Sequence, residues 1–151
     1  MRSNLRFNLS HSHEFGLFAI ARHREIGIDL ERIRSGLADT QIAERFFAVE
    51  EIRILRALPR DAQDKAFFDC WARKEAYVKA KGEGLSMPLD QFEVSLVPGE
   101  PTALLSTKAN PQEASRWSFR ELFPAHGFVA AVAVQGNDWR LKCWEYPWGV
   151  K

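Results

Sequence analysis

The sequence predicts an α+β fold in which an antiparallel sheet packs against one long helix. Strand-like patterns occupy residues 5–30 and again residues 92–144, and helical periodicity fills residues 39–81 between them. Strands followed by helices and then by strands, without regular β-α alternation, are typical of α+β proteins. The chain contains no repeat, low-complexity tract or linker, so we expect residues 1–151 to form one domain.

The first strands are indicated by side-chain patterning. Residues 5–9 alternate between apolar and polar side chains, and residues 15–21 and 26–30 are apolar runs of strand length. Residues 22–25 (Arg-His-Arg-Glu) separate the last two runs and predict a hairpin turn. We therefore expect these three strands to form a small antiparallel sheet.

Two short helices follow. Asp39 or Thr40 is expected to cap a helix that runs to Phe47. Residues 50–58 place apolar side chains at helical spacing, and Pro59 ends that helix.

The longest helix is expected to begin near Asp61 and to end at Lys81, because Gly82 and Gly84 are good helix-stop residues. Its apolar face is predicted from three-to-four spacing and contains Phe67, Phe68, Trp71, Glu75 and Val78. Glu75 is therefore an acid on an otherwise apolar face, which is costly unless a partner satisfies it.

The remainder is predicted to be rich in strands. Residues 92–96, 117–123 and 139–144 alternate, whereas residues 128–134 form a continuous apolar run. A continuous run of this length indicates a central strand that is buried on both faces. Turns are expected at 98–101, 110–111 and 136–138.

Composition excludes several function classes. The chain is 46% hydrophobic and 27% charged with a net charge of +1, so it has no global field that would attract nucleic acid or an acidic membrane. Cys70 and Cys143 form no CxxC pattern, which argues against a zinc site or a disulfide framework. No apolar run has membrane-spanning length, and the first residues do not resemble a signal peptide. We expect a cytoplasmic protein.

Asp29 and Glu31 are the first candidate functional residues. They are two residues apart on a predicted strand, so they should lie side by side while Ile28 and Leu30 face the core. Two carboxylates about 4 Å apart repel by roughly 4 kcal/mol at an effective dielectric of about 20, and a cation relieves that repulsion. Oxygen ligands suit magnesium. The alternative is surface ion pairing with neighbouring arginines.

Lys74, Glu75 and Lys79 form a second cluster on the long helix. One interpretation is an ordinary ion pair between Glu75 and Lys79 at i,i+4. The other is that the lysines hold phosphate oxygens while Glu75 binds a metal or accepts a proton.

Ser10 and His11 belong to a third candidate, the Asn-Leu-Ser-His-Ser sequence at residues 8–12. Hydroxyls, an imidazole and backbone amides at a strand end make a reasonable anion cradle. The alternative is ordinary capping of a turn by Ser and Asn.

Taken together, these segments resemble the 4′-phosphopantetheinyl transferase superfamily, in particular its surfactin-synthetase-activating type. The resemblance follows chain order and lies in residues 7–12, 26–31, 45–51, 71–79 and 82–89. It implies Mg²⁺-dependent transfer of the 4′-phosphopantetheine arm of coenzyme A to a serine of an acyl or peptidyl carrier protein. The leaving group would be adenosine 3′,5′-bisphosphate.

The resemblance also implies residue roles. Asp29, Glu31 and Glu75 would be the magnesium ligands. Ser10, His11, Lys74 and Lys79 would bind the coenzyme A phosphates, with Lys79 nearest the scissile group. Glu51, with Glu50 as its competitor, would be the acid that follows the Phe-Phe pair, and it or Glu75 would accept the proton of the carrier serine.

Members of this family type have two similar halves, and this sequence resembles one of them. The single-half relatives form trimers with active sites between subunits, so we expect an apolar surface that is buried in a homo-oligomer. Arg53, Arg56 and Arg60 are spaced to form a basic stripe that would dock an acidic carrier, the alternative being a solvated helix face. A relative that binds coenzyme A or a carrier without turnover is the alternative function.

Overall fold

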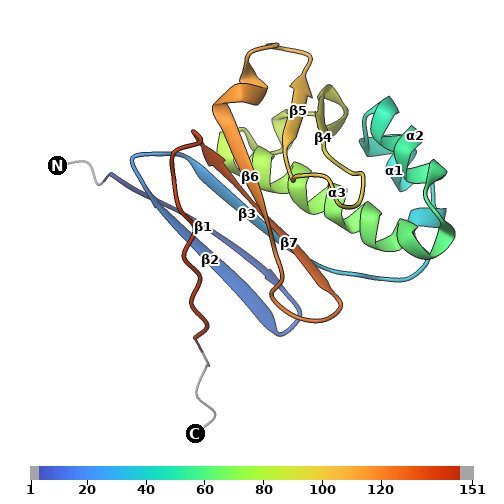
Figure 1. Cartoon of the computed structure of the whole chain (residues 1–151), viewed down its shortest axis with the longest axis horizontal. Coiled ribbons are helices and arrows are strands. Elements are labelled where there is room, and N and C mark those ends of the chain that lie inside the picture. The colour runs from blue at the N-terminus through green and yellow to red at the C-terminus, as the bar shows by residue number, and fades with distance from the viewer. Residues whose placement is uncertain (1–3, 147–151) are drawn as a thin grey trace, which may run out of the picture.

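The computed structural model describes residues 4–146, with the side chains of Asp39 and Leu85 excepted. The chain order of the strands and α-helices is β1 (Leu5–Ser12), β2 (Phe15–Arg22), β3 (Ile26–Arg32), α1 (Ile42–Phe46), α2 (Val49–Ala57), α3 (Arg60–Lys81), β4 (Phe92–Val94), β5 (Leu104–Thr107), β6 (Trp117–Leu122) and β7 (Phe128–Gln135) (Figure 1). The predicted α+β class, with an antiparallel sheet on a long helix, is confirmed. No helix within the described residues is long and apolar enough to cross a membrane.

The central sheet is antiparallel and has the strand order β3-β7-β6. The apolar run predicted to be a central strand is β7, and each residue from Val129 to Val134 is at most 3% exposed. One face of this sheet packs against α3, which lies behind it in Figure 1. The other face carries a second apolar cluster that includes Ile26, Val132 and Val134 and is covered in part by β2.

The β1–β2 hairpin is a separate two-stranded sheet that lies beside β3. Side chains make this junction: the Ile28 N–H donates to Asn8 Oδ1 at 2.8 Å, and the Leu30 N–H donates to Ser10 Oγ at 3.0 Å. The predicted hairpin turn at residues 22–25 is wrong, because β2 pairs with β1 whereas β3 pairs with β7. Residues 22–25 therefore connect two different sheets, and β3 pairs with β7, about 100 residues further along the chain.

Helix α3 begins at Arg60, one residue before the predicted start, with Pro59 at the N-cap position. It ends as predicted at Gly82, whose φ of 70° is the left-handed conformation that glycine adopts without strain. Short side chains at Ala76 and Ala80 let this helix approach β3 closely. Together these features place the second half of α3 directly on the strand that carries Asp29.

Helices α1 and α2 lie near the N-terminal end of α3 (Figure 1). Helix α1 has Gln41 as its N-cap residue, and the hydroxyl of Thr40 accepts a 3.4 Å hydrogen bond from the Ile42 N–H. The predicted capping role of the Asp39 side chain lies outside what the structure describes.

Strand β5, which pairs with β4, has no counterpart in the predicted elements. Conversely, residues 139–144 alternate in sequence but form no strand, so that prediction is wrong. Trp139 explains part of this outcome, because its indole N–H donates to Ser118 Oγ at 2.6 Å and its ring packs against the second apolar cluster. The segment is therefore fixed by side-chain contacts instead of a strand ladder.

Candidate active site

Strand β3 directs its acids toward α3. Gly27, Asp29 and Glu31 share one face of the strand because side chains alternate. A Cβ on Gly27 would lie 2.0 Å from the Ala76 carbonyl oxygen, so this face is the one in contact with the helix. Ile28 and Leu30 are buried on the opposite face, as predicted. The face of the acids is covered as well, because α3 packs on it and leaves Asp29 7% exposed.

One carboxyl oxygen of Asp29 has no hydrogen-bond partner. Its Oδ2 is buried and accepts no hydrogen bond in the structure. Burial raises the pKa of Asp29 to about 9, with further increases from the carboxyls of Glu31 and Glu75, while Lys79 acts in the opposite direction. A buried acceptor without a partner costs about 1–3 kcal/mol, so the site retains an unsatisfied group at a measurable cost in stability.

Glu75 and Lys79 bring α3 into the same site. Glu75 is half-buried, and burial followed by the charge of Glu31 raises its pKa. Burial lowers the pKa of Lys79, against the opposing effects of Asp29, Glu75 and Glu31. We call Asp29, Glu31 and Glu75 the carboxylate cluster; its members and Lys79 interact electrostatically.

Lys79 is held in place by the strands. Its ammonium group donates to the carbonyl oxygen of Leu9 at 2.9 Å and to that of Ile28. Among the described residues, no ion pair joins Glu75 to Lys79, so the simple i,i+4 surface pair is not what forms. An ammonium group has three N–H donors. Lys79 uses two of them on these carbonyl oxygens, so one N–H remains for a further acceptor next to the cluster.

The carboxylate cluster has the oxygen donors that a divalent cation needs, but its side chains are not arranged around a cation position. Within residues 4–146, no group of three or more His, Cys, Asp or Glu side chains is arranged ready to hold a metal ion. The buried, unpartnered Asp29 Oδ2 beside two further carboxyls is nevertheless the donor set that a hard cation prefers. Each further carboxyl beside Asp29 raises the pKa of Asp29, and a cation between these groups would relieve their repulsion.

Ser10 and His11 point to opposite faces of strand β1. Ser10 is 8% exposed, and its hydroxyl oxygen already accepts the Leu30 N–H. His11 is exposed on the outer face of the hairpin. Alternation along a strand separates the two side chains that the sequence suggested would form one cradle.

Lys74 and Glu51 lie away from the cluster and bind each other. Lys74 is 0% exposed, and its Nζ lies 2.9 Å from Glu51 Oε1 while donating to the carbonyl oxygens of Leu89 and Phe92. Glu51 also accepts the N–H groups of Ala48 and Val94. This buried pair and its backbone partners tie α2, α3 and β4 together.

The predicted basic stripe does not form one helix face. Arg53 forms a two-pronged pair with Glu50, and Arg56 does the same with Glu44. Arg60 belongs to α3 and not to α2. These arginines interact mainly with the acids of neighbouring turns, which reduces the charge that they present to a partner.

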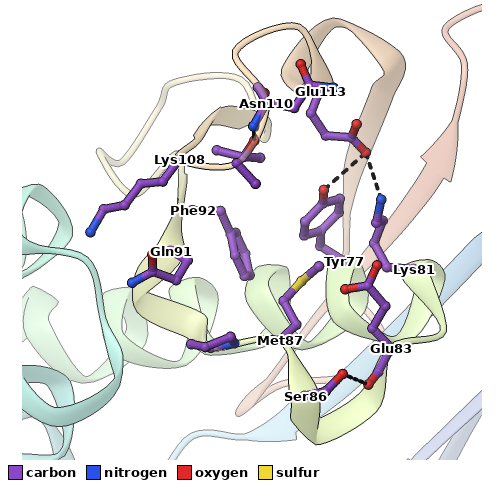
Figure 2. Close-up of a pocket in the computed structure, with 13 residues that line it drawn as sticks. Tyr77, Lys81, Glu83, Ser86, Met87, Gln91, Phe92, Lys108, Asn110 and Glu113 are labelled. Carbon is purple, nitrogen blue, oxygen red and sulfur yellow. Dashed lines mark hydrogen bonds and ion pairs between the residues drawn. The ribbon is translucent and has the colours of Figure 1, made fainter.

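A pocket of about 530 Å³ lies on the flank of α3 that carries Tyr77, roughly opposite Glu75. Figure 2 shows Glu113 at its wall, accepting hydrogen bonds from the Tyr77 hydroxyl and the Lys81 ammonium. Phe92 and Met87 supply apolar surface. None of the predicted site residues lines this pocket, so the cluster and this cavity are separate features of α3.

Sequence reasoning did not single out Gly27 or Asn8. Gly27 lets α3 approach β3, and Asn8 joins β1 to the edge of β3. A glycine two residues before an acid in an apolar strand is the one sequence signal from which this close contact could be predicted.

Comparison with known proteins places this architecture in a family. Residues 25–133 match the model of the 4′-phosphopantetheinyl transferase superfamily. The chain is 44% identical over 144 residues to 4′-phosphopantetheinyl transferase HetI of Nostoc sp., covering 95% of this chain and 57% of that protein. It is 40% identical over 90 residues to 4′-phosphopantetheinyl transferase Sfp of Bacillus subtilis, covering 60% of this chain and 39% of that protein.

Solved structures share the fold. Thermotoga maritima holo-[acyl-carrier-protein] synthase superposes with a TM-score of 0.56 at 20% identity, covering 74% of this chain and 62% of that chain. The Helicobacter pylori synthase in complex with coenzyme A gives 0.54 at 22% identity, covering 74% of this chain and 99% of that chain. The chain spans about half the length of the curated relatives it matches. On the family match and the HetI identity, the chain belongs to the 4′-phosphopantetheinyl transferase superfamily.

Proposed function

We propose that this protein transfers the 4′-phosphopantetheine arm of coenzyme A to a serine of an acyl or peptidyl carrier protein, with Mg²⁺ as cofactor. The observation that carries this proposal is the buried, unpartnered carboxylate oxygen of Asp29, beside Glu31, Glu75 and Lys79. Such a group of acids is unfavourable for folding and is explained by a cationic ligand. Family membership makes a magnesium-bound pyrophosphate the fitting one.

Asp29, Glu31 and Glu75 are the residues that we propose to hold the metal. When bound, Mg²⁺ supplies charge neutralisation for the pyrophosphate of coenzyme A. Lys79, fixed by two strand carbonyls, offers its remaining N–H to a phosphate oxygen near the scissile bond. We also propose that Ser10 and His11 of β1 contact the coenzyme A phosphates, although their side chains lie on opposite faces of that strand.

Glu75 is our proposed proton acceptor for the carrier serine. The serine oxygen bonds to the phosphorus, the bond to adenosine 3′,5′-bisphosphate breaks, and the hydroxyl proton passes to a Glu75 carboxylate oxygen. Burial, followed by the charge of Glu31, raises the pKa of Glu75 in the metal-free protein. With Mg²⁺ bound, the Glu75 oxygen that does not hold the metal would be the one that accepts the proton. Glu51 is not proposed for this role, because its carboxylate is buried against Lys74.

A second candidate function is binding of coenzyme A or a carrier protein without turnover. The observation that favours it is that, within residues 4–146, no group of three or more His, Cys, Asp or Glu side chains is arranged to hold a metal ion. Proteins of this kind would retain the cluster and lose the transfer reaction.

Incubation with fluorescent coenzyme A and an apo carrier protein, with and without Mg²⁺, tests the proposal. Labelling of the carrier is expected only with Mg²⁺, and Asp29→Asn and Glu75→Gln should each reduce its rate by about 100-fold or more. Asp90→Asn, an exposed acid outside the cluster, is the matched control and should label normally. Coenzyme A binding without labelling would support the second candidate, and absence of both would reject the two functions together.

A further inference from the structure

Side chains, and not a strand ladder, hold the edge of β3 that faces β1. Among the described strands, β3 pairs only with β7, although β1 lies beside it. The N–H groups of Ile28 and Leu30 point toward β1, and a buried backbone N–H without an acceptor is costly. Asn8 Oδ1 accepts the first at 2.8 Å, and Ser10 Oγ accepts the second at 3.0 Å. These two hydrogen bonds therefore fix the backbone on either side of Asp29.

The ammonium group of Lys79 lies between the same two strands. It donates to the carbonyl oxygen of Leu9 on β1 at 2.9 Å and to that of Ile28 on β3. Leu9 lies between Asn8 and Ser10 in the chain, so the Lys79 contact falls between the two side-chain contacts. Ile28 is thus held twice, with its N–H bound to Asn8 and its carbonyl oxygen bound to Lys79.

The two carbonyl contacts determine what Lys79 does beside the carboxylate cluster. Among the described residues, no ion pair joins Lys79 to Asp29 or Glu75. A lysine released from the strand carbonyls would be free to form such a pair, because opposite charges at short range attract strongly. Its ammonium group would then compete with a divalent cation for the same carboxylate oxygens.

We propose that Asn8 is a positioning residue for the carboxylate cluster, an inference that rests on the proposed function. By accepting the Ile28 N–H, its side chain keeps β1 against β3 and keeps Lys79 on the strand carbonyls. The carboxylates are thereby left to the cation. Asn8 acts through Ile28 and Lys79, and residues that support metal ligands in this indirect way commonly change metal affinity or activity by about 10–100-fold.

Isothermal titration calorimetry of the full chain with Mg²⁺ tests this role without any need for turnover. Asn8→Leu is similar in size but lacks the acceptor, and it should raise the dissociation constant for Mg²⁺ by about 10-fold or more. Asn8→Asp keeps an oxygen in the place of Oδ1, and its dissociation constant should exceed that of the wild type by no more than about threefold.

Asn110→Leu is the matched control. Asn110 Oδ1 accepts the Gln112 N–H at 3.0 Å, which is the same kind of hydrogen bond, but Asn110 lines the pocket on the other flank of α3. This variant should bind Mg²⁺ like the wild type.

Two further measurements separate positioning from a general loss of stability. In amide hydrogen exchange, the Ile28 N–H of Asn8→Leu should exchange at least about 10-fold faster than in the wild type, with a much smaller change at residues 129–134. In the carrier-labelling assay, raising the Mg²⁺ concentration should restore most of the rate of Asn8→Leu, because its defect is a weaker metal site. Asp29→Asn, which lacks a metal ligand, should not be restored.

Three results would overturn the role of Asn8 alone while the wild type still labels the carrier. One is an Asn8→Leu variant that binds Mg²⁺ as tightly as the wild type. Another is an Asn8→Asp variant that binds as weakly as Asn8→Leu. The third is an equal loss of affinity in Asn110→Leu. A wild type that neither binds Mg²⁺ nor labels the carrier would reject the proposed function and this inference together.

Discussion

At the scale of single residues, Asp29 shows a conflict between folding and function. Its Oδ2 is buried without a hydrogen-bond partner, next to the carboxyls of Glu31 and Glu75. The fold tolerates this arrangement because Lys79 offsets part of the repulsion. Unfavourable groups of this kind accumulate where a ligand is to be bound, and replacing them commonly raises stability while function is lost.

We therefore predict that Asp29→Asn is more stable than the wild type when divalent cations are absent. At pH 7 the folded wild type must hold a proton on Asp29 that the unfolded chain has released, and the neutral amide avoids this cost. The expected gain is about 1–3 kcal/mol in the free energy of unfolding at pH 7. The pKa of Asp29 in the folded protein is about 9, whereas its ordinary value is 3.8. Because the folded state holds a proton that the unfolded chain releases, wild-type stability attributable to Asp29 falls as pH rises from about 4 to about 9.

Urea denaturation at several pH values measures this effect. The gap between Asp29→Asn and the wild type should widen toward alkaline pH, and Asp90→Asn should show no such widening. With millimolar Mg²⁺, the wild type and Asp90→Asn should gain stability through ligand binding, and Asp29→Asn should not. A gap that stays constant between pH 5 and pH 9, or a less stable Asp29→Asn, would contradict the prediction.

At the scale of elements, the contact between β3 and α3 forms the site. Neither element carries the whole cluster: β3 provides Asp29 and Glu31, and α3 provides Glu75 and Lys79. Their separation depends on Gly27, whose missing side chain allows the helix backbone at Ala76 to come close.

Gly27→Ala should therefore strongly destabilise the protein. The new Cβ would lie 2.0 Å from the Ala76 carbonyl oxygen and 2.5 Å from the Ala80 nitrogen, and these are backbone atoms that cannot rotate away. We expect a loss of about 3 kcal/mol or more in the free energy of unfolding, measured by urea denaturation. The matched change in a strand of the same molecule is Gly16→Ala, where the nearest atom is 3.9 Å from the new Cβ.

Gly16→Ala should alter stability by no more than about 0.5 kcal/mol. Equal effects at the two glycines would show that strand propensity, and not the approach of α3, controls the outcome. If Gly27→Ala folds well, the spacing between β3 and α3 is more adaptable than the structure indicates.

At the scale of the whole molecule, β7 is the centre of stability. It pairs with β3 on one side and β6 on the other, and its faces meet α3 and the second apolar cluster. Strand β5, in contrast, pairs only with β4 among the described strands, and its Leu105 is 51% exposed although its Leu104 is buried. Regions with few buried contacts open locally before the core does.

Amide hydrogen exchange should reveal this difference. Amides of residues 129–134 are expected to exchange only through global unfolding, whereas those of β5 should exchange at least about 100-fold faster through local opening. Exchange followed by NMR under native conditions measures both. Equal protection in β5 and β7 would indicate that the molecule opens as a single cooperative unit.

Much of the fold was predictable from local patterns. The apolar run of β7, the helical periodicity of α3 and its stop at Gly82 depend on neighbouring residues alone, and these elements were identified correctly. The carboxylates were recognised as a group because acids in an apolar strand and on an apolar helix face are rare. Strand pairing could not be predicted from local patterns, because β3 pairs with β7, about 100 residues further along the chain. The alternation of residues 139–144 wrongly predicted a strand.

The class of fold, the family resemblance and the acids of the candidate site follow from periodicity and residue type, so they could be predicted from the sequence. Which lysine accompanies the acids could not be predicted, because it depends on long-range packing. Lys79 is directed to the strands beside Asp29, whereas Lys74, five residues earlier on the same helix, is buried against Glu51. Helix geometry turns these two side chains in different directions, and long-range packing decides what each of them meets.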